Sequence, residues 1–296
     1  MKRLFFVYNE HAGKGIIRNK LAEIISMFTQ AGYIVTAYPT QRALDAYDKV
    51  CEVDGEYDMV VCSGGDGTLN EVISAVMNHT HERPRIGYIP AGTTNDFATS
   101  YKIPKTPLKA AKVVLGNKYT KCDIGMFNGR YFNYVAAFGF LTDVSYKTPQ
   151  NIKNVLGHQA YVLESIKSLN SIAAYRMNIK FNDMEIKGDF IYGMVANSYS
   201  VGGFKGITGN TVQLDDGLFE VVLVKEPLNA LELQQVVAGL FSRTHDSPMV
   251  LRFKAKQIVF ESQEPVAWTM DGEFGDAHQR VEISVLDKAV EIMSNL

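Results

Sequence analysis

The stretch of sequence that decides the fold is Ser63-Gly64-Gly65-Asp66-Gly67-Thr68-Leu69-Asn70-Glu71, which directly follows a mostly apolar run at 57–62. Three glycines within four positions permit a tight turn and let backbone N–H groups face an anion. The amino end of a following helix also favours negative charge. We therefore expect a buried strand, a phosphate-binding loop and a helix at this point of the chain.

Asp66 stands among the amides of this loop. A carboxylate there repels a phosphate unless a cation lies between them, so Asp66 predicts Mg2+ bound together with a nucleotide. The alternative is a tight turn that needs no ligand. Under either interpretation, the spacing of Thr68 and Glu71 predicts a capping box at the start of the helix.

The first part of the chain, from residue 2 to about residue 116, alternates strand-like runs with helical periodicity. Leu21, Ile24, Ile25 and Phe28 mark the clearest helical face. This alternation predicts a parallel sheet covered by helices, in which ligands bind beyond the carboxyl ends of the strands. The expected strands are at 4–8, 33–38, 57–62 and 85–89.

Two more loops should emerge at the same edge of this sheet, at 9–15 after the first strand and at 90–96 after the fourth. Neither is a Walker A loop, and the first does not complete a GxGxxG motif. Lys14 is a candidate counter-charge for phosphate, and Thr93 and Asn95 are candidate hydrogen-bond donors. A helix cap at 93–96 is the alternative that needs no ligand.

After about residue 119 the pattern becomes that of an antiparallel β domain. Asn128-Gly129, between alternating runs at 121–127 and 131–137, is a strong hairpin signal, and Asn182-Asp183 is a second short turn. Two helices are expected, at 152–170 and 228–241. Further strands are expected at 175–181, 189–197, 219–224, 250–260, 266–270 and 280–286.

Composition limits the class of protein. A chain of 296 residues has room for two domains, and its formal net charge of -2 argues against a nucleic-acid partner. The longest apolar run, at 134–141, is far too short to span a bilayer. The 3 cysteines are far apart, which suits a reducing cytoplasm, and the 6 histidines show no zinc-ligand spacing.

Together these motifs resemble the diacylglycerol kinase catalytic domain, a lipid kinase family that includes bacterial diacylglycerol kinases and sphingosine and ceramide kinases. The signature GGDGTLNEV stands at 64–72, and Gly92-Thr93-Thr94-Asn95-Asp96-Phe97 is similar to the second nucleotide motif. Asp216-Gly217-Leu218 and Asp271-Gly272-Glu273 resemble two later motifs. The resemblance covers nearly the whole chain.

The resemblance implies a phosphofructokinase-like α/β domain at 1–122 that binds nucleotide, followed by an antiparallel β-sandwich at 123–286 that binds a lipid substrate. Residues 287–296 would return to the first domain. The implied reaction transfers the γ-phosphoryl group of ATP, with Mg2+, to the hydroxyl of diacylglycerol or a related lipid. Such an enzyme would be cytoplasmic, would act at a membrane surface in phospholipid synthesis, and leaves room for a homodimer.

The resemblance also assigns roles to residues. Glu273 is expected to be the catalytic base. Asp66 is expected to lie near the metal ion of the nucleotide. Asp271 lies on the same face as Glu273 if the segment is extended, and would share the metal or orient Glu273. Without the resemblance, a solvated hairpin turn is the preferred interpretation of 271–273. A structural Mg2+ would take the Asp216 carboxylate and the carbonyls of Gln213 and Leu218. The residues expected at the nucleotide are Asn9, Gly13, Lys14, Thr40, Gly64, Gly65, Asp66, Gly67, Thr68, Asn70, Glu71, Gly92, Thr93 and Asn95.

The chain departs from the family pattern at two positions. Glu10 stands where the first loop usually has proline. Asp123 and Asn95 match an Asp and an Asn that bacterial diacylglycerol kinases link to a lysine, but Glu164 stands at the lysine position. Two other functions stay open: a kinase for a soluble acceptor of the NAD-kinase type, which shares the GGDG motif, and a non-catalytic nucleotide- or lipid-binding module.

Overall fold

The computed structural model describes residues 2–13, 15–79, 81–116, 118–140, 142, 173–202, 204–205, 207–209, 212–241 and 247–296. The chain divides into two compact units. Unit 1 consists of Met1–Ile124 and Leu286–Leu296, and unit 2 of Gly125–Val285. The chain enters unit 2 within β5 (Tyr119–Phe127) and leaves it within β15 (Glu273–Met293).

Unit 1 is built on a parallel sheet, as the sequence predicts. β1 (Lys2–Tyr8) lies between β2 (Tyr33–Pro39) and β3 (Met59–Gly64), and β3 pairs with β4 (Arg85–Pro90). The last residues of the chain join the sheet, because Ile292 of β15 pairs in parallel with Ile86. The buried Asp123 carboxylate accepts the backbone N–H of Lys288 at 2.7 Å, which ties β5 to this segment.

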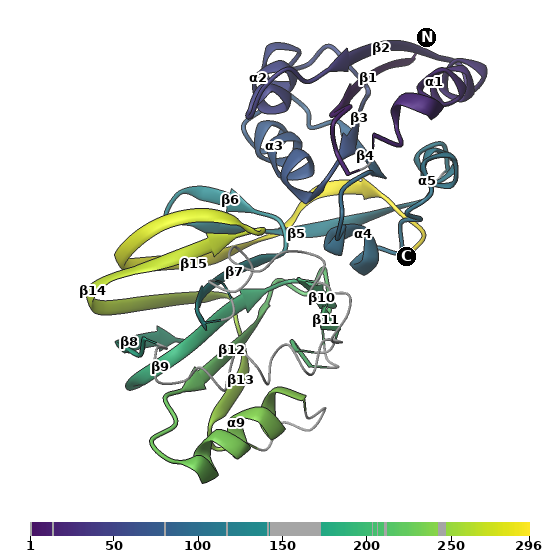
Figure 1. Ribbon diagram of the computed structural model, residues 1–296. Helices are drawn as coiled ribbons and strands as arrows, with labels where there is room; N and C mark the ends of the chain where they lie inside the picture. The colour runs from purple at the N-terminus through teal and green to yellow at the C-terminus, as the bar shows by residue number, and fades with distance from the viewer. Residues whose placement is uncertain are drawn as a thin grey trace. The chain divides into compact units, whose positions relative to one another are not determined.

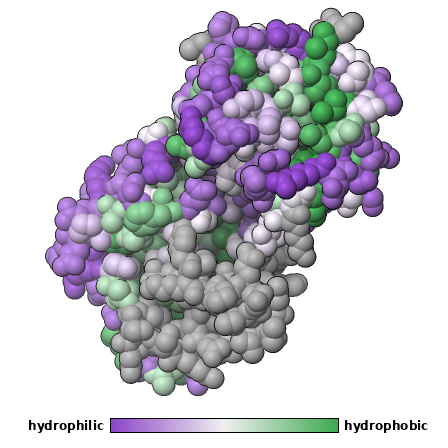
Figure 2. Space-filling model, turned by 45° about the horizontal axis from the view of Figure 1, so that its top comes forward, coloured by the Kyte–Doolittle hydropathy of each residue, from purple (hydrophilic) through white to green (hydrophobic). Residues whose placement is uncertain are grey.

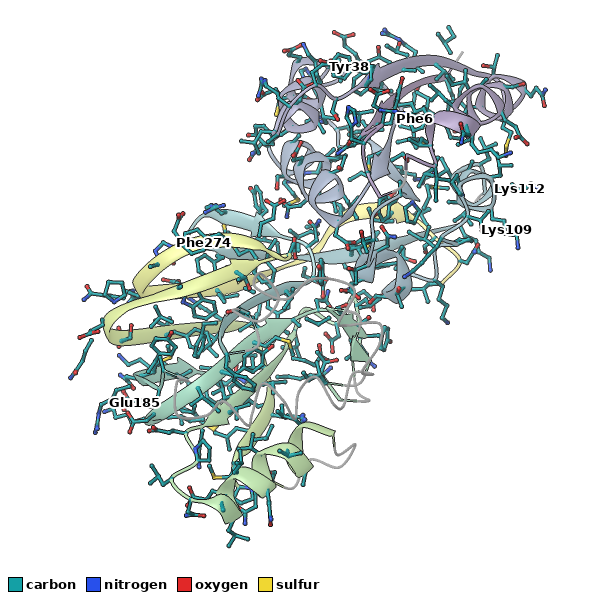
Figure 3. The ribbon with its side chains drawn as sticks, viewed as in Figure 1. Phe6, Tyr38, Lys109, Lys112, Glu185 and Phe274 are labelled. Atoms are coloured by element: carbon teal, nitrogen blue, oxygen red, sulfur yellow. The ribbon has the colours of Figure 1, made fainter. Side chains whose placement is uncertain are left out.

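Helices cover both faces of this sheet (Figure 1). α1 (Leu21–Gln30) and α5 (Pro107–Val114) pack on one face, and α2 (Asp45–Glu52) and α3 (Asp66–Met77) on the other. The predicted apolar face of α1 is confirmed, since Ile24 and Phe28 are fully buried. Phe6 of β1 (Figure 3) meets Phe28 edge to face, with ring centroids 5.8 Å apart. Two short helical turns, η1 (Arg18–Lys20) and α4 (Asp96–Ser100), complete the unit.

Unit 2 is an antiparallel β-sandwich. Its strands follow the order β13-β12-β9-β7-β14-β15, and β8 pairs with both β9 and β14. The helix α9 packs against β13. The elements are β6 (Arg130–Phe132), β7 (Val135–Gly139), β8 (Tyr175–Phe181), β9 (Met184–Ala196), β10 (Ser200–Val201), β11 (Phe204–Lys205), β12 (Phe219–Lys225), α9 (Ala230–Phe241), β13 (Val250–Ala255) and β14 (Gln257–Met270).

The strands of unit 2 bury apolar side chains on both faces. One cluster surrounds Trp268, which contacts the rings of Phe127, Phe138 and Phe260. The other cluster includes Val236, on α9. The predicted fold class, an α/β domain followed by an antiparallel β-sandwich, is confirmed.

Several predicted turns and strand limits can be compared with the structure. The hairpin at Asn128-Gly129 is present, with both residues at positive φ and β5 paired with β6. The single strand predicted at 131–137 is wrong: the chain forms two strands, β6 and β7, which pair with different neighbours. Where one strand gives way to the other, the N–H groups of 133–135 donate to the Asp271 carboxylate. The single strand predicted at 250–260 is also wrong, because the chain changes partners at Lys256, from β12 to β15 and β8.

The two predicted helices of unit 2 have different outcomes. The helix predicted at 228–241 is α9, which begins at Ala230 after Asn229 caps it by accepting the N–H of Glu232 at 2.9 Å. The helix predicted at 152–170, with Glu164, lies outside the described residues. Within the described chain no helix is long and apolar enough to cross a bilayer. Among the coloured residues of the face drawn in Figure 2, hydrophilic ones predominate and apolar ones form smaller groups.

Candidate active site

Three loops of unit 1 meet at the carboxyl edge of its sheet, after β1, β3 and β4. The N–H of Asn9 donates to the carbonyl of Ser63 at 2.8 Å. The N–H groups of Ala91 and Gly92 both donate to the carbonyl of Gly64, at 2.7 and 3.1 Å. The prediction that these loops emerge together is confirmed, and β3 supplies the carbonyls that hold the outer two loops.

Glycines at this junction serve different purposes. Gly13 has φ +57°, and a Cβ there would strike the carbonyl oxygen of Ala91. A Cβ on Gly92 would lie 2.5 Å from the Cα of Gly65. Gly65 itself has ordinary extended backbone (φ -83°, ψ -175°), and its Cβ would meet nothing nearer than 3.5 Å. The close approach of the loops therefore requires glycine at 13 and 92 but leaves the glycine at 65 unexplained.

Asp66 is the first residue of α3, and its carboxylate has protein partners. It accepts the N–H groups of Asp96 and Phe97, at 3.2 and 3.4 Å, where α4 begins. The premise that only a cation accounts for this carboxylate is therefore wrong, because amides of α4 also stabilise its charge. Burial raises the pKa of the Tyr88 hydroxyl and the charge of Asp66 raises it further, so Tyr88 stays protonated and donates to the carbonyl of Gly64 at 3.2 Å.

The predicted capping box of Thr68 and Glu71 is wrong. α3 begins two residues before Thr68, whose side chain fills the space that a Cβ on Gly64 would need. The Glu71 carboxylate instead accepts the N–H groups of Leu44 and Ala46, both at 3.1 Å, at the start of α2. These two bonds fix α2 against α3. Gly67 and Asn70 lie in the same amino-terminal part of α3.

Asn95 closes the loop after β4. It is 4% exposed with φ +52°, and it makes reciprocal hydrogen bonds with Gly92, accepting the Gly92 N–H at 2.9 Å and donating to the Gly92 carbonyl at 2.7 Å. No side-chain bond from Asn95 caps α4, so the alternative of a helix cap is also wrong. Thr93 is exposed at the tip of this loop.

The remaining predicted nucleotide residues lie around the first loop. The Asn9 side chain accepts the N–H of His11 at 2.9 Å, and the N–H of Thr40 donates to the end of β1 at 2.9 Å. Glu10, at the position where proline is usual, lies 3.5 Å from the guanidinium of Arg18. Lys14 lies outside the described residues.

In unit 2, residues 271–273 form the turn between β14 and β15. Asp271 and Gly272 have φ +50° and +89°, so the extended segment assumed for Asp271 is wrong and the hairpin interpretation is correct. Asp271 is only 7% exposed, and its carboxylate accepts three N–H groups: Asn133 at 2.6 Å, Tyr134 at 3.0 Å and Val135 at 3.1 Å. The neighbouring Glu273 is exposed.

Two buried polar side chains were missed by sequence reasoning. Within the described chain, neither the hydroxyl of Ser63 nor the amide of Asn133 has a hydrogen-bond partner, although these residues are 0% and 2% exposed. The position of Ser63, directly before the glycines, was an available signal. For Asn133 no local signal exists, because only the fold brings it to the 271–273 turn.

In the set predicted for a structural Mg2+, the Asp216 carboxylate does not fit that ion, because both of its oxygens already have partners. One carboxylate oxygen of Asp216 accepts the N–H of Leu218 at 3.1 Å, and the other lies 2.7 Å from the Lys254 ammonium. Mg2+ needs near-octahedral oxygen ligands at about 2.0 to 2.1 Å, and an ammonium beside the carboxylate opposes it. Across the residues that the structure describes, no group of three His, Cys, Asp or Glu is placed to hold a metal ion.

Comparison with known proteins agrees with this architecture. The family profile of the diacylglycerol kinase catalytic domain matches residues 3–127, and that of the YegS C-terminal NAD kinase beta sandwich-like domain matches residues 137–294. A diacylglycerol kinase of Staphylococcus epidermidis is 34% identical over 276 residues, 93% of this chain and 86% of that protein. One of Bacillus subtilis is 33% identical over 277 residues, 93% of this chain and 91% of that protein.

A solved structure shares the fold. A diacylglycerol kinase from Bacillus anthracis superposes with a TM-score of 0.79 at 21% identity, covering 99% of this chain and 97% of that one. The family profile of the catalytic domain and the two relatives together show that the chain is an enzyme of the lipid kinase class. The chain belongs to the diacylglycerol kinase catalytic domain family, as its motifs predict.

Proposed function

We propose that this lipid kinase uses ATP and phosphorylates the hydroxyl of diacylglycerol or a closely related lipid. In this reaction the lipid oxygen bonds to the γ-phosphorus, the bond from that phosphorus to the β–γ bridging oxygen breaks, and ADP leaves. The hydroxyl proton passes to a protein base. The observation that carries the proposal is Gly65: neither its backbone nor its neighbours require glycine, so the missing side chain serves a ligand.

The nucleotide phosphates would lie against the junction of the three loops. Amides of the glycine loop and the amino end of α3 offer donors and positive potential to a phosphate. The nucleotide residues are those predicted from sequence, with Asn95 and Glu71 acting through the shape of the loops. Mg2+ bound to the nucleotide would neutralise phosphate charge, and Asp66 is the residue that would hold it, because Mg2+ prefers carboxylate oxygens and a carboxylate that accepts N–H groups can still be a metal ligand.

Glu273 is the proposed base. It is exposed on the β14–β15 hairpin, and it follows a turn that Asp271 fixes through three hydrogen bonds. We assign Asp271 a positioning role, since its carboxylate is committed to the backbone of 133–135. A positioned general base contributes about 10² to 10⁴ in rate.

The acceptor would bind beside this hairpin. Phe274, next to Glu273, is 59% exposed and labelled in Figure 3, and it offers apolar surface to a lipid. The named activity of the S. epidermidis and B. subtilis relatives supports diacylglycerol as the acceptor. The protein would associate reversibly with a membrane surface to reach it.

The test is phosphate transfer from labelled ATP, with Mg2+, to vesicles that contain diacylglycerol or ceramide, with NAD as a soluble acceptor. We expect labelled phosphatidic acid. Labelled NADP instead would identify a soluble-acceptor kinase, and ATP binding without any labelled product would identify a non-catalytic module. Glu273→Gln should remove turnover and keep ATP binding, whereas the exposed Glu264→Gln on β14 should behave like wild type.

A further inference from the structure

Three charged side chains of unit 2 meet where β12 begins. Glu220 of β12 and Lys254 of β13 are directly opposite each other in the antiparallel register. The Lys254 ammonium lies 2.7 Å from the Asp216 carboxylate and 3.2 Å from that of Glu220. One nitrogen therefore serves two carboxylates, one from a turn and one from a strand.

This cluster lies inside the unit. Glu220 is 3% exposed, and the side chains of Asp216 and Lys254 are 18% and 27% exposed. Burying a carboxylate costs several kcal/mol unless a counter-charge accompanies it. The Lys254 ammonium, 3.2 Å from Oε1 of Glu220, is the counter-charge that compensates the buried carboxylate of Glu220.

The turn before β12 orients Asp216 toward this nitrogen. The N–H of Leu218 donates to one oxygen of Asp216 at 3.1 Å, which leaves the other oxygen to Lys254. The backbone carbonyl of Lys254 accepts the side-chain amide of Asn182 at 2.8 Å, so the strand that carries the lysine is held as well. Both ends of the Asp216–Lys254 pair are thus fixed by hydrogen bonds to neighbouring segments.

We propose that Lys254 is the built-in cation of this cluster, standing where a divalent ion would otherwise join Asp216 to the strands of unit 2. The Lys254 ammonium is part of the side chain of β13, so the cluster needs no cation from solution. Unit 2 therefore holds its β12–β13 corner in the absence of Mg2+. The inference is independent of the proposed function, since it concerns the fold of unit 2 and not the nucleotide.

The test is thermal unfolding of the full chain without nucleotide or lipid, in EDTA and with excess Mg2+. Wild type should melt at the same temperature in both conditions. Lys254→Met keeps the apolar stem and removes the charge, and in EDTA it should melt lower by an amount on the order of 10 °C. Mg2+ should recover part of that loss, because the Asp216 carboxylate, no longer paired with an ammonium, is then available to a divalent ion. The matched control is Lys180→Met, which breaks an exposed pair with Glu261 and should change little in either condition.

Three results would overturn the proposal. One is a wild-type melting temperature that falls in EDTA and recovers with Mg2+. The others are a Lys254→Met protein that melts like wild type in EDTA, or one that melts lower and ignores Mg2+. If Lys254→Met does not fold, Lys254→Arg keeps the charge and should fold with no dependence on Mg2+, and a dependence in that variant also overturns the proposal.

Discussion

Replacing Gly65 and Gly92 by alanine, one at a time, separates a glycine that the fold requires from one that a ligand requires. The two residues face each other across the loop junction. A Cβ on Gly92 would lie 2.5 Å from the Cα of Gly65, where ordinary carbon contacts are about 3.5 to 4.0 Å. A Cβ on Gly65 would lie 3.5 Å from its nearest neighbour. One methyl group does not fit and the other does.

The expected magnitudes follow from this difference. Gly92→Ala must separate two backbones by about 1 Å, and such overpacking costs about 1 to 3 kcal/mol of unfolding free energy. Gly65→Ala should stay within about 1 kcal/mol of wild type, because its backbone is open to alanine. Its methyl group would keep a phosphate from the backbone amides. Losing one hydrogen bond to a charged group costs about 1.5 to 3 kcal/mol, or roughly 10- to 150-fold in the Kd for ATP.

Urea unfolding measures the free energies, and calorimetry with ATP and Mg2+ measures the Kd. Gly188→Ala is the matched control, because a Cβ on Gly188 of β9 would also meet only ordinary contacts, at 3.6 Å. It should leave both stability and ATP affinity unchanged. If Gly65→Ala binds ATP as tightly as wild type, the glycine loop is a structural turn, and the nucleotide site proposed at it is refuted.

Three further changes test the structural roles of the carboxylates of Glu71, Asp271 and Glu220. Glu71→Gln should lower the free energy of unfolding, measured in urea, by about 1 to 2 kcal/mol, because the Glu71 carboxylate caps α2. The exposed Glu52→Gln is the control and should not lower it. An effect of Glu71→Gln on ATP affinity alone would contradict this role. Asp271→Asn should lower the free energy of unfolding by about 2 to 4 kcal/mol, since an amide replaces a carboxylate that accepts three N–H groups. The exposed Asp276→Asn is the control. If the two variants are equally stable, the three hydrogen bonds of Asp271 do not contribute to stability. Burial raises the pKa of Glu220 from 4.5 to about 7. Between these two pH values the native state therefore binds more protons than the unfolded state. The stability that Glu220 contributes below about pH 4.5 is lost as the pH rises through about 7. Wild type minus Glu220→Gln should therefore lose up to about 3 kcal/mol between about pH 5 and about pH 8, and a pH-independent difference would show that the carboxyl titrates normally.

The sequence was sufficient where structure is decided by neighbouring residues. Alternation of short apolar runs with helical periodicity predicts the parallel sheet, because each strand and helix carries its own pattern. Asn128-Gly129 and Asn182-Asp183 both sit at turns with positive φ, which these residue types tolerate better than others. The three loops could be placed at one edge because parallel strands put their carboxyl ends on the same side.

The sequence does not reveal a hydrogen-bond partner that is distant in the chain. The Asp271 carboxylate binds N–H groups more than 130 residues away, and Glu71 binds N–H groups about 25 residues away. In both cases an acidic residue inside a motif looks catalytic or ligand-binding, although its hydrogen bonds hold a loop or helix in place. Lys254 shows the same limit, since nothing near Asp216 in the sequence indicates that a lysine of β13 would occupy its carboxylate.

Asp66 shows that one carboxylate can both hold a neighbouring helix in place and belong to a ligand site. A carboxylate beside a glycine loop must be compensated, and either a cation or the amides of another helix can do this. Sequence reasoning chose the cation because α4 begins 30 residues later, at Asp96. The structure supplies amides of α4, and a carboxylate that is held by hydrogen bonds can still be a ligand of a metal ion. Because the bonds to Asp96 and Phe97 hold the Asp66 side chain in place without any ligand, that carboxylate would be preorganised for the metal ion in the nucleotide site that we propose.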